Sequence, residues 1–362
     1  MIKQLLAGTA MAFALSACHQ HEDPHLPGQG QGLDLVFADS TYQLTGVAKQ
    51  DGGKLLVNYP RWSAVYKYAV TQVTGLTSNK PYPNEATNSW NEKESGKNKW
   101  VCVQSVYADD DNNIWVLDPA APFLKTIVDD GPKLVKMEGG MMAKKYFFKD
   151  ILPDTAYVND VRIDTKRKYA YLTESKRGGI IVLDLASGKM RVVLSNHYSV
   201  KSDPSYKFII DGMELMKDGK PVKFNSDGIA LTPDGNWLYY KPVTDDKLYR
   251  IETAALRNWN LDDAALGAKV QDLGHFVTTD GMIFDKQGNL YLGDLQRYRM
   301  VKIDPSLNMT VLIQDPRLIW PDSYSIADGY LYLTCSQIHK QPEYNNGVNK
   351  RVTPYTVYRL KL

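Results

Sequence analysis

Cysteine and histidine are scarce in this sequence, and several motifs that mark large enzyme classes are missing. The 362 residues include 3 cysteines, which excludes a disulfide-rich scaffold. Cys102 and Cys335 lie in separate strand-like segments and are expected to be two buried free thiols. The spacing of His197, His275 and His339 matches no zinc motif. No nucleophile elbow, phosphate-binding loop or dinucleotide fingerprint is present.

Strong net charge is also missing, and so is long helical periodicity. The formal net charge is +2, so the sequence indicates neither a nucleic-acid partner nor attraction to an anionic surface. Thr253–Trp259 is the best short candidate for a helix. Hydrophobic residues make up 43% of the chain, which is ample for a large core and excludes a disordered protein.

What the sequence contains instead is a repeated hairpin. Asp227–Tyr240 reads DGIALTPDGNWLYY, and Asp280–Gly293 repeats the pattern as DGMIFDKQGNLYLG. Turn residues between two runs of strand formers predict a β-hairpin in both places. Similar hairpins begin at four further positions, which are Gly46, Ser105, Asp160 and Asp322.

The hairpins are followed by further strand-like runs, so each unit contains about four strands. Units of this kind, repeated every ~40–65 residues, are typical of propeller blades. We therefore predict an all-β fold, a six-bladed β-propeller with four-stranded antiparallel blades. Leu33–Phe37 has no blade of its own and should close the ring beside Tyr355–Leu362 in the last blade. Thr74–Lys99 is expected to be a long irregular loop, and Lys201–Lys223 an insertion with a small hairpin near Lys217.

The amino terminus has the pattern of an exported lipoprotein. Residues 1–17 combine Lys3 with a short apolar run, which predicts a signal peptide and not a membrane span. Leu15–Cys18 reads LSAC and resembles a bacterial lipobox, which implies cleavage before Cys18 and lipid on that residue. His19 then indicates the outer membrane in a cell that has one. Residues 18–32 are expected to be a flexible tether, and residues 33–362 the propeller.

Ordinary cleavage near Ala17 is the alternative, and it would leave a free Cys18 on a periplasmic or extracellular protein. In the lipoprotein interpretation, the lipid is the protein's one contact with the membrane. We expect the propeller itself to be a monomer.

Propeller geometry predicts one ligand pocket at the mouth of the central channel. The first residues of each innermost strand and the last residues of the second strand lie at the same face, which gathers residues from distant parts of the chain. Aromatic walls with a few polar groups are usual in small-molecule pockets, and acids beside aromatic rings suit an organic amine. The candidate ligand-binding residues are Tyr59, Arg61, Trp62, Asn159, Glu174, Asp294, Tyr324 and His339.

Four acids occupy equivalent positions in four blades and are expected to surround the channel axis: Asp160, Asp227, Asp280 and Asp322. At ~6 Å and an effective dielectric near 20, each like-charge pair costs about 3 kcal/mol. A bound cation, protonation of one carboxyl, or a partner such as Arg61 must offset that repulsion. Oxygen ligands suit Ca²⁺ or another divalent cation. The alternative is structural: an aspartate before glycine caps the turn into a strand, and a repeated fold repeats such caps.

Six short motifs together resemble the Yellow/major royal jelly protein family. They are Asn58–Trp62, Lys80–Asn84, Trp115–Asp118, Tyr157–Val161, Tyr171–Glu174 and Trp320–Asp322. The resemblance covers about residues 33–362 and implies a six-bladed propeller of secreted proteins. Some members of that family bind small aromatic amines at the channel mouth, and others are linked to pigment pathways. No catalytic mechanism is general to the family, so the resemblance leaves open whether this protein is an enzyme.

A more distant resemblance is to the gluconolactonase and senescence-marker propellers. Those proteins hold a divalent cation with Glu, Asn and Asp, and the cation polarises a lactone for attack by water. Asp280 matches the Asp motif, whereas Asp227 stands where that family has Asn, and Thr45-Gly46 stands where it has Glu. Three hypotheses follow: an amine-binding propeller, a metal-dependent lactone or ester hydrolase, and a scaffold whose Thr74–Lys99 loop meets a protein partner.

Overall fold

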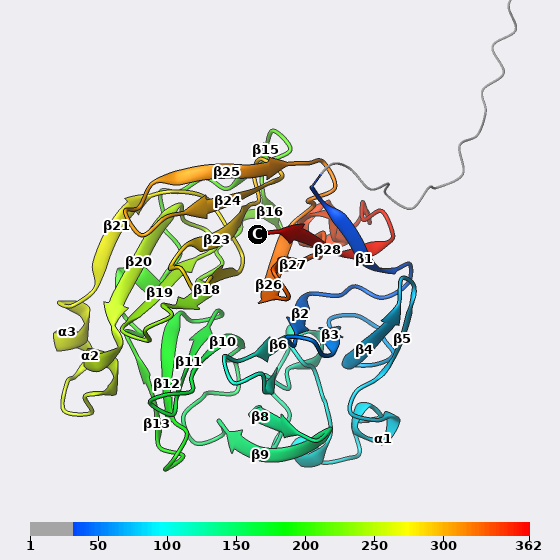
Figure 1. Ribbon diagram of the computed structural model, residues 1–362, viewed down its shortest axis with the longest axis horizontal. Coiled ribbons are helices and arrows are strands. Elements are labelled where there is room, and N and C mark those ends of the chain that lie inside the picture. The colour runs from blue at the N-terminus through cyan, green and yellow to red at the C-terminus, as the bar shows by residue number, and fades with distance from the viewer. Residues whose placement is uncertain (1–31) are drawn as a thin grey trace, which may run out of the picture.

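The structure, a computed structural model, describes residues 32–362. The predicted signal peptide, Cys18 and nearly all of the predicted tether lie outside the described residues. Within residues 32–362 the main strands build six four-stranded antiparallel sheets around a central axis (Figure 1). The prediction of an all-β, six-bladed propeller is therefore confirmed. Within this described range, no helix is both long and apolar enough to span a membrane.

The first three blades each use four consecutive strands, with the innermost strand first. Blade 1 contains β2 (Gly46–Lys49), β3 (Leu55–Asn58), β4 (Val70–Gly75) and β5 (Ser78–Pro81). Blade 2 contains β6 (Ser105–Ala108), β7 (Ile114–Asp118), β8 (Lys133–Glu138) and β9 (Met141–Phe147). Blade 3 contains β10 (Val158–Asp164), β11 (Tyr169–Glu174), β12 (Gly179–Asp184) and β13 (Met190–Val193).

The remaining blades continue the pattern, and the last one borrows a strand from the start of the chain. Blade 4 contains β18 (Ser226–Leu231), β19 (Trp237–Pro242), β20 (Lys247–Glu252) and β21 (Gln271–His275). Blade 5 contains β22 (Met282–Phe284), β23 (Leu290–Asp294), β24 (Arg299–Ile303) and β25 (Met309–Gln314). Blade 6 contains β26 (Pro321–Ala327), β27 (Tyr330–Cys335), β28 (Tyr355–Lys361) and β1 (Asp34–Asp39).

The ring closes as predicted, through pairing of the two ends of the described chain. Strand β1 runs antiparallel to β28, with Phe37 opposite Val357 and Asp39 opposite Tyr355. The innermost strand β2 then contacts β26 of the last blade on one side and β6 on the other. Because β1 covers the edge of β28, the closing blade does not offer that strand for pairing with another chain.

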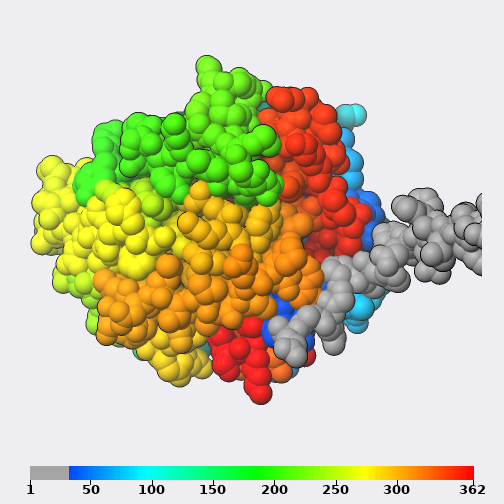
Figure 2. All heavy atoms as spheres, turned by 90° about the horizontal axis from the view of Figure 1, so that it is seen from above, coloured from blue at the N-terminus to red at the C-terminus, as the bar shows by residue number. Residues whose placement is uncertain are grey.

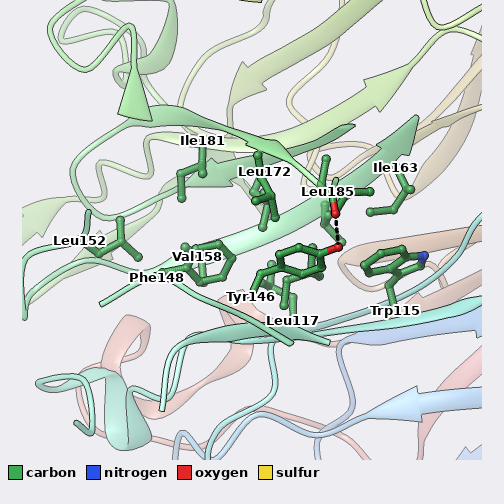
Figure 3. Close-up of a cluster of buried hydrophobic side chains, with 14 of the residues drawn as sticks. Trp115, Leu117, Tyr146, Phe148, Leu152, Val158, Ile163, Leu172, Ile181 and Leu185 are labelled. Carbon is green, nitrogen blue, oxygen red and sulfur yellow. Dashed lines mark hydrogen bonds between the residues drawn. The ribbon is translucent and has the colours of Figure 1, made fainter. Parts of the chain in front are cut away.

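Large apolar side chains fill the spaces between blades. Figure 3 shows the cluster between blades 2 and 3, where Trp115 and Leu117 of β7 lie near Leu172 of β11. The hydroxyl of Tyr146 donates to the carbonyl oxygen of Leu185 across 2.7 Å. Every residue of β7 is buried, because a second strand has a neighbouring blade on each side. Each such large apolar side chain stabilises the fold by about 1.5–3 kcal/mol, so the blades hold the loops of both faces in place.

The prediction of an irregular loop over Thr74–Lys99 is wrong in its first part. Residues Ser78–Pro81 form β5, the outermost strand of blade 1, and short helices follow at α1 (Glu85–Asn88) and η1 (Gly96–Asn98). The sequence does not reveal this strand, because an outermost strand needs only backbone pairing and β5 alternates exposed with half-buried residues. The rest is anchored by the buried Asn88, whose Oδ1 accepts hydrogen bonds from Ala69 and Val70.

An insertion between blades 3 and 4, residues 201–225, carries two small hairpins. They are β14 (Ile209–Ile210) with β15 (Met213–Glu214), and β16 (Met216–Lys217) with β17 (Lys220–Pro221). The second confirms the hairpin predicted near Lys217. In Figure 2 this green insertion rises from one face of the propeller, beside the red segment that follows β27. We call residues 201–225 the mouth insertion.

The other local predictions have similar outcomes. The predicted short helix is α2 (Thr253–Arg257), and a second helix, α3 (Asp263–Gly267), follows it. Cys102 and Cys335 are both buried and free, as expected for two cysteines in different blades.

Candidate ligand-binding site

A cavity of about 300 Å³ opens at the face where the innermost strands begin, which we call the upper face. Its walls are rich in aromatic rings, and its lining also includes the Asp227 and Asp280 carboxyl groups. The aromatic residues come from four loops and the mouth insertion, and they are Trp62, Tyr157, Phe224, Trp320 and Tyr344. Polar and charged lining residues include Gln104, Asn159, Lys176, Lys217 and Lys223.

Two carboxyl groups lie side by side in this cavity, and each has a dedicated side-chain donor. The Asn159 amide Nδ2 donates to Oδ1 of Asp227. The Trp320 indole Nε1 donates to Oδ2 of Asp280 across 2.6 Å. Asp280 is 8% exposed, so water screens its charge weakly. These contacts orient the pair toward the cavity that both residues line.

Burial and mutual repulsion raise the pKa values of the channel acids. Burial is the largest cause for Asp227, whose pKa is raised further by the neighbouring Asp280 and then by Asp322 and Asp160. Burial also raises the pKa of Asp280 to about 6. Hydrogen bonds from Trp320 and Asp227 act in the opposite direction, because they favour the ionised form. The pKa of Asp322 is raised by burial and by Asp280. Within the pair, Asp227 therefore holds its proton more tightly than Asp280, whose carboxyl ionises as the pH rises through about 6.

The repulsion at Asp160 is offset by an arginine that the sequence analysis did not select. Arg162 Nη1 lies 3.1 Å from Oδ2 of Asp160, and the Ser105 hydroxyl donates to Oδ1 across 2.8 Å. The predicted partner, Arg61, is elsewhere: its guanidinium lies over the rings of Tyr66 and Trp90. Its suggested role as a partner of the channel acids is therefore wrong.

The same arginine reaches across to blade 5 and lines a second cavity. Arg162 Nη2 donates to the carbonyl oxygen of Met282 in blade 5 across 2.7 Å. Its side chain lines a second cavity of about 400 Å³ at the opposite face, formed at the far ends of the innermost strands. The upper cavity shares none of these lining residues.

The glycine that follows two of the acids has a structural cause. A Cβ on Gly228 would lie 2.4 Å from the carbonyl oxygen of Asp280, and one on Gly281 would lie 2.4 Å from that of Asp322. Neighbouring innermost strands approach too closely there for any side chain. The capping alternative fits Asp160, whose Oδ1 accepts from the Val161 backbone amide. Asp227 and Asp280 instead bond to side chains that line the cavity.

The acids do not assemble into a metal site as they are placed. Among residues 32–362, no group of three or more His, Cys, Asp or Glu side chains is positioned to hold a metal ion. Asp160 forms an ion pair with Arg162, so its carboxylate is already partnered. Ca²⁺ takes six to eight oxygen ligands. Within the described residues, Oδ2 of Asp322 is a buried oxygen without a hydrogen-bond partner. The described side chains therefore form no preassembled site for a divalent cation, and we derive no chemical step through one.

Two predicted ligand-binding residues line the cavity, and two others hold loops in place. Trp62 and Asn159 belong to the lining. Glu174 is 3% exposed, and its carboxylate accepts hydrogen bonds from the backbone amides of Tyr157 and Arg177. Asp294 is fully buried and bonded to Arg299 Nε across 2.7 Å. Glu174 thus shapes the Tyr157 segment from outside the pocket.

The remaining predicted residues lie outside the lining. The Tyr59 hydroxyl donates to Asp39 across 3.0 Å at a separate outer cavity. Tyr324 is buried in the core that involves blades 5 and 6. His339 stands behind the pocket, with its ring stacked on that of Trp320 at 5.6 Å. Burial lowers the pKa of His339 to about 4, so its ring is neutral near pH 7.

Several lining residues were not selected from the sequence. Trp62 Nε1 donates to the Tyr157 hydroxyl across 2.9 Å, and that hydroxyl donates to Gln104 Oε1 across 2.7 Å. Tyr157 and Trp320 each precede a channel acid by two or three residues, and that spacing was a usable signal. The ring of Phe224 comes from the mouth insertion, and no sequence pattern placed it over the channel.

Comparison with known proteins agrees with this architecture. The family model described as major royal jelly protein matches residues 101–362, which is well over half of the chain. No curated protein matches the sequence.

Several solved structures share the fold at low sequence identity. A luciferin-regenerating enzyme superposes with a TM-score of 0.56 at 12% identity, covering 91% of this chain and 95% of that chain. A PQQ-bound aldose sugar dehydrogenase from Streptomyces coelicolor has a TM-score of 0.52 at 11% identity, covering 91% and 97%. A gluconolactonase from Xanthomonas campestris has a TM-score of 0.51 at 10% identity, covering 91% and 89%. At these identities the likeness concerns the propeller fold alone.

Proposed function

The chain belongs to the major royal jelly protein family, and on that premise we propose that it binds a small organic amine in the upper cavity. One observation carries the proposal: the cavity combines aromatic walls with the neighbouring carboxyl groups of Asp227 and Asp280. A ligand ammonium group beside ionised Asp280 would offset the charge that burial makes unfavourable. Aromatic rings around a cation contribute a further ~0.5–2 kcal/mol.

The size and charge of the cavity support a particular orientation of the ligand. A volume of about 300 Å³ is at the lower end for ligand pockets, which favours a single-ring amine. Lys217 and Lys223 are contributed by the mouth insertion, and the ammonium of Lys217 lies 5.6 Å from the centre of the Tyr344 ring. The ligand cation would therefore point toward the acids, with its aromatic ring and any hydroxyl groups toward the lysines.

Isothermal calorimetry with a panel of arylalkylamines and catechol derivatives tests this proposal. We expect saturable heat from at least one amine, and a loss of tenfold or more in affinity for Trp62→Ala. A panel without any heat of binding in the wild-type protein would remove the proposal.

A divalent-metal-dependent lactone or ester hydrolase remains a second hypothesis. The observation that favours testing it is the buried Asp322 Oδ2, which has no hydrogen-bond partner among residues 32–362. Elemental analysis of calcium-equilibrated protein should be combined with a lactone assay before and after chelation. Activity that requires metal and is lost in Asp280→Ala would support the hydrolase. Lactone hydrolysis that survives both chelation and Asp280→Ala would remove it.

We also propose that the protein is exported and anchored by lipid on Cys18. The support is the LSAC sequence at Leu15–Cys18, after a short apolar run. Mass spectrometry of the protein purified from membranes should find a diacylglyceryl group on an amino-terminal Cys18. Cys18→Ser should move the protein to the soluble fraction. An unmodified Cys18 in the mature wild-type protein would contradict the anchor and leave the ligand proposal intact.

A further inference from the structure

Trp320 occupies an unusual position between the mouth insertion and the acid pair. Its side chain is 1% exposed, and its backbone has a φ of 58°, a conformation that bulky residues rarely adopt. The Ser336 backbone amide holds the Trp320 carbonyl oxygen across 3.1 Å. Backbone strain of this kind clusters at active sites, ligand clamps and switch regions. In this conformation the indole N–H of Trp320 donates to Oδ2 of Asp280.

Trp320 also packs in the hydrophobic core beneath the mouth insertion. Phe208 and Ile210 of the insertion are buried in one cluster with Trp320. The ring centres of Phe208 and Trp320 are 5.7 Å apart. At the tip of the first hairpin, Asp211 accepts hydrogen bonds from the Tyr298 hydroxyl and the Lys340 ammonium. The insertion is thus fastened over the residue that bonds to Asp280.

We infer that Trp320 is a positioning residue that fixes the ionised Asp280 carboxylate toward the ligand and couples this orientation to the seating of the mouth insertion. This inference rests on the proposed amine binding, to which it adds the residue that orients the binding carboxylate. The geometry that carries it is the single indole ring shared by the insertion core and the acid pair.

The charges around Asp280 determine the sign of the expected effect. Asp227 donates a hydrogen bond to Asp280, and the charges of Asp160 and Lys241 act on it. The Asp280 charge in turn acts on Asp322, Tyr324 and Tyr344. The indole N–H favours the ionised carboxylate, so its removal should raise the pKa of Asp280. Amine binding to the ionised form would then require a higher pH.

The first experiment compares wild type with Trp320→Phe, which keeps an aromatic ring in the insertion core and removes the N–H. We expect about a tenfold loss of amine affinity at pH 7, and an upward shift of about one pH unit in the midpoint of the affinity profile. Trp100→Phe is the matched control, because Trp100 is equally buried and donates to the Tyr82 carbonyl outside the pocket. Its profile should coincide with that of wild type.

A double-mutant cycle tests the coupling to the insertion. Asp211→Ala removes both hydrogen bonds at the hairpin tip. We expect it to weaken amine binding several-fold in the wild-type background and to have little effect in Trp320→Phe, because the bond that transmits the change is already gone. Equal effects in both backgrounds would overturn the coupling.

A measurement without ligand separates this inference from the proposed function. The carboxyl carbon of Asp280, followed by ¹³C NMR, should titrate with a higher midpoint in Trp320→Phe than in wild type, whether or not any amine binds. An unchanged midpoint would overturn the positioning role. If Trp320→Phe does not fold, replacement of Trp320 by 3-benzothienylalanine keeps the shape and exchanges only the N–H for sulfur. The same shift is expected there, and its absence would be equally decisive.

Discussion

Lys133 and Asp118 form an ion pair in which both side chains are completely buried, with Nζ 3.0 Å from Oδ2. The ammonium also donates to the carbonyl oxygens of Gly96 and Gly131. The carboxylate in turn accepts from the backbone amides of Val101 and other residues at the upper face. The pair therefore holds the loop that leads into blade 2, close to the ligand pocket.

Breaking this pair should destabilise the protein strongly. Lys133→Met leaves the Asp118 charge buried without its partner, which typically costs about 3–5 kcal/mol in unfolding free energy. Guanidinium unfolding measures the effect. Lys136→Met on the same strand is the matched control, because its partner Glu138 is exposed and surface pairs contribute about 0–1 kcal/mol. Equal losses in the two variants would contradict the structural role of the buried pair.

Neutralising Asp280 should stabilise the protein at neutral pH. The pKa of Asp280 is raised by burial to about 6, so the folded state binds this proton more tightly than the unfolded state. The stabilisation that comes from binding this proton is complete below about pH 4 and is lost as the pH rises through 6. Asp280→Asn should therefore gain ~1–3 kcal/mol at pH 7.5 and almost nothing at pH 4.

Chemical denaturation at the two pH values provides the measurement. Asp150→Asn, at an exposed turn, is the control and should change the unfolding free energy by less than about 0.5 kcal/mol at either pH. A destabilised Asp280→Asn protein at pH 7.5 would contradict the proposed charge state.

Amine affinity should depend on pH with a defined sign. A quaternary ammonium ligand keeps its charge at every pH, so the titration observed is that of the protein. Its affinity should rise as the pH increases through about 6 and level off above 7, because Asp280 becomes ionised over that range. Calorimetry from pH 4.5 to 8.5 checks the profile, and an affinity that falls with rising pH would be inconsistent with binding by this carboxylate.

Ring closure should contribute strongly to stability. A chain that begins at Gly32 retains β1, whereas one that begins at Thr41 loses it together with the buried Leu33 and Phe37. Loss of each such side chain typically costs about 2–5 kcal/mol, and the edge of β28 becomes exposed. Thermal unfolding and size-exclusion chromatography should show a much lower Tm and aggregation for the shorter chain. Similar behaviour of both chains would show that β1 does not close the ring in solution.

Most of the fold could be predicted from turn chemistry and strand repeats. The repeat at Asp227–Tyr240 corresponds to β18 and β19 to within two residues at each end. Apolar and aromatic strand formers give these central strands a clear signal, since both of their faces are buried. The outermost strand β5 carries the sequence SNKP and has no such signal, so the sequence alone predicts a loop there.

The candidate site could be predicted only in part. Trp62, Asn159, Asp227 and Asp280 were correctly brought to one cavity because strand ends in a propeller meet at one face. The partner of Asp160 was missed, although Arg162 follows it by two residues and so lies on the same side of β10. The aromatic rings supplied by the mouth insertion depend on tertiary packing, which local patterns do not encode.

In the proposed site, the carboxyl pair of Asp227 and Asp280 recognises the positive charge of a small aromatic ligand. The most direct test of this recognition is calorimetric titration of wild type and Asp280→Asn with 2-phenylethylamine and with the uncharged 2-phenylethanol at pH 7.5. We expect wild type to prefer the amine by tenfold or more, and Asp280→Asn to lose this preference. Equal affinity of wild type for the two compounds, or a preference for the amine that persists in Asp280→Asn, would contradict it.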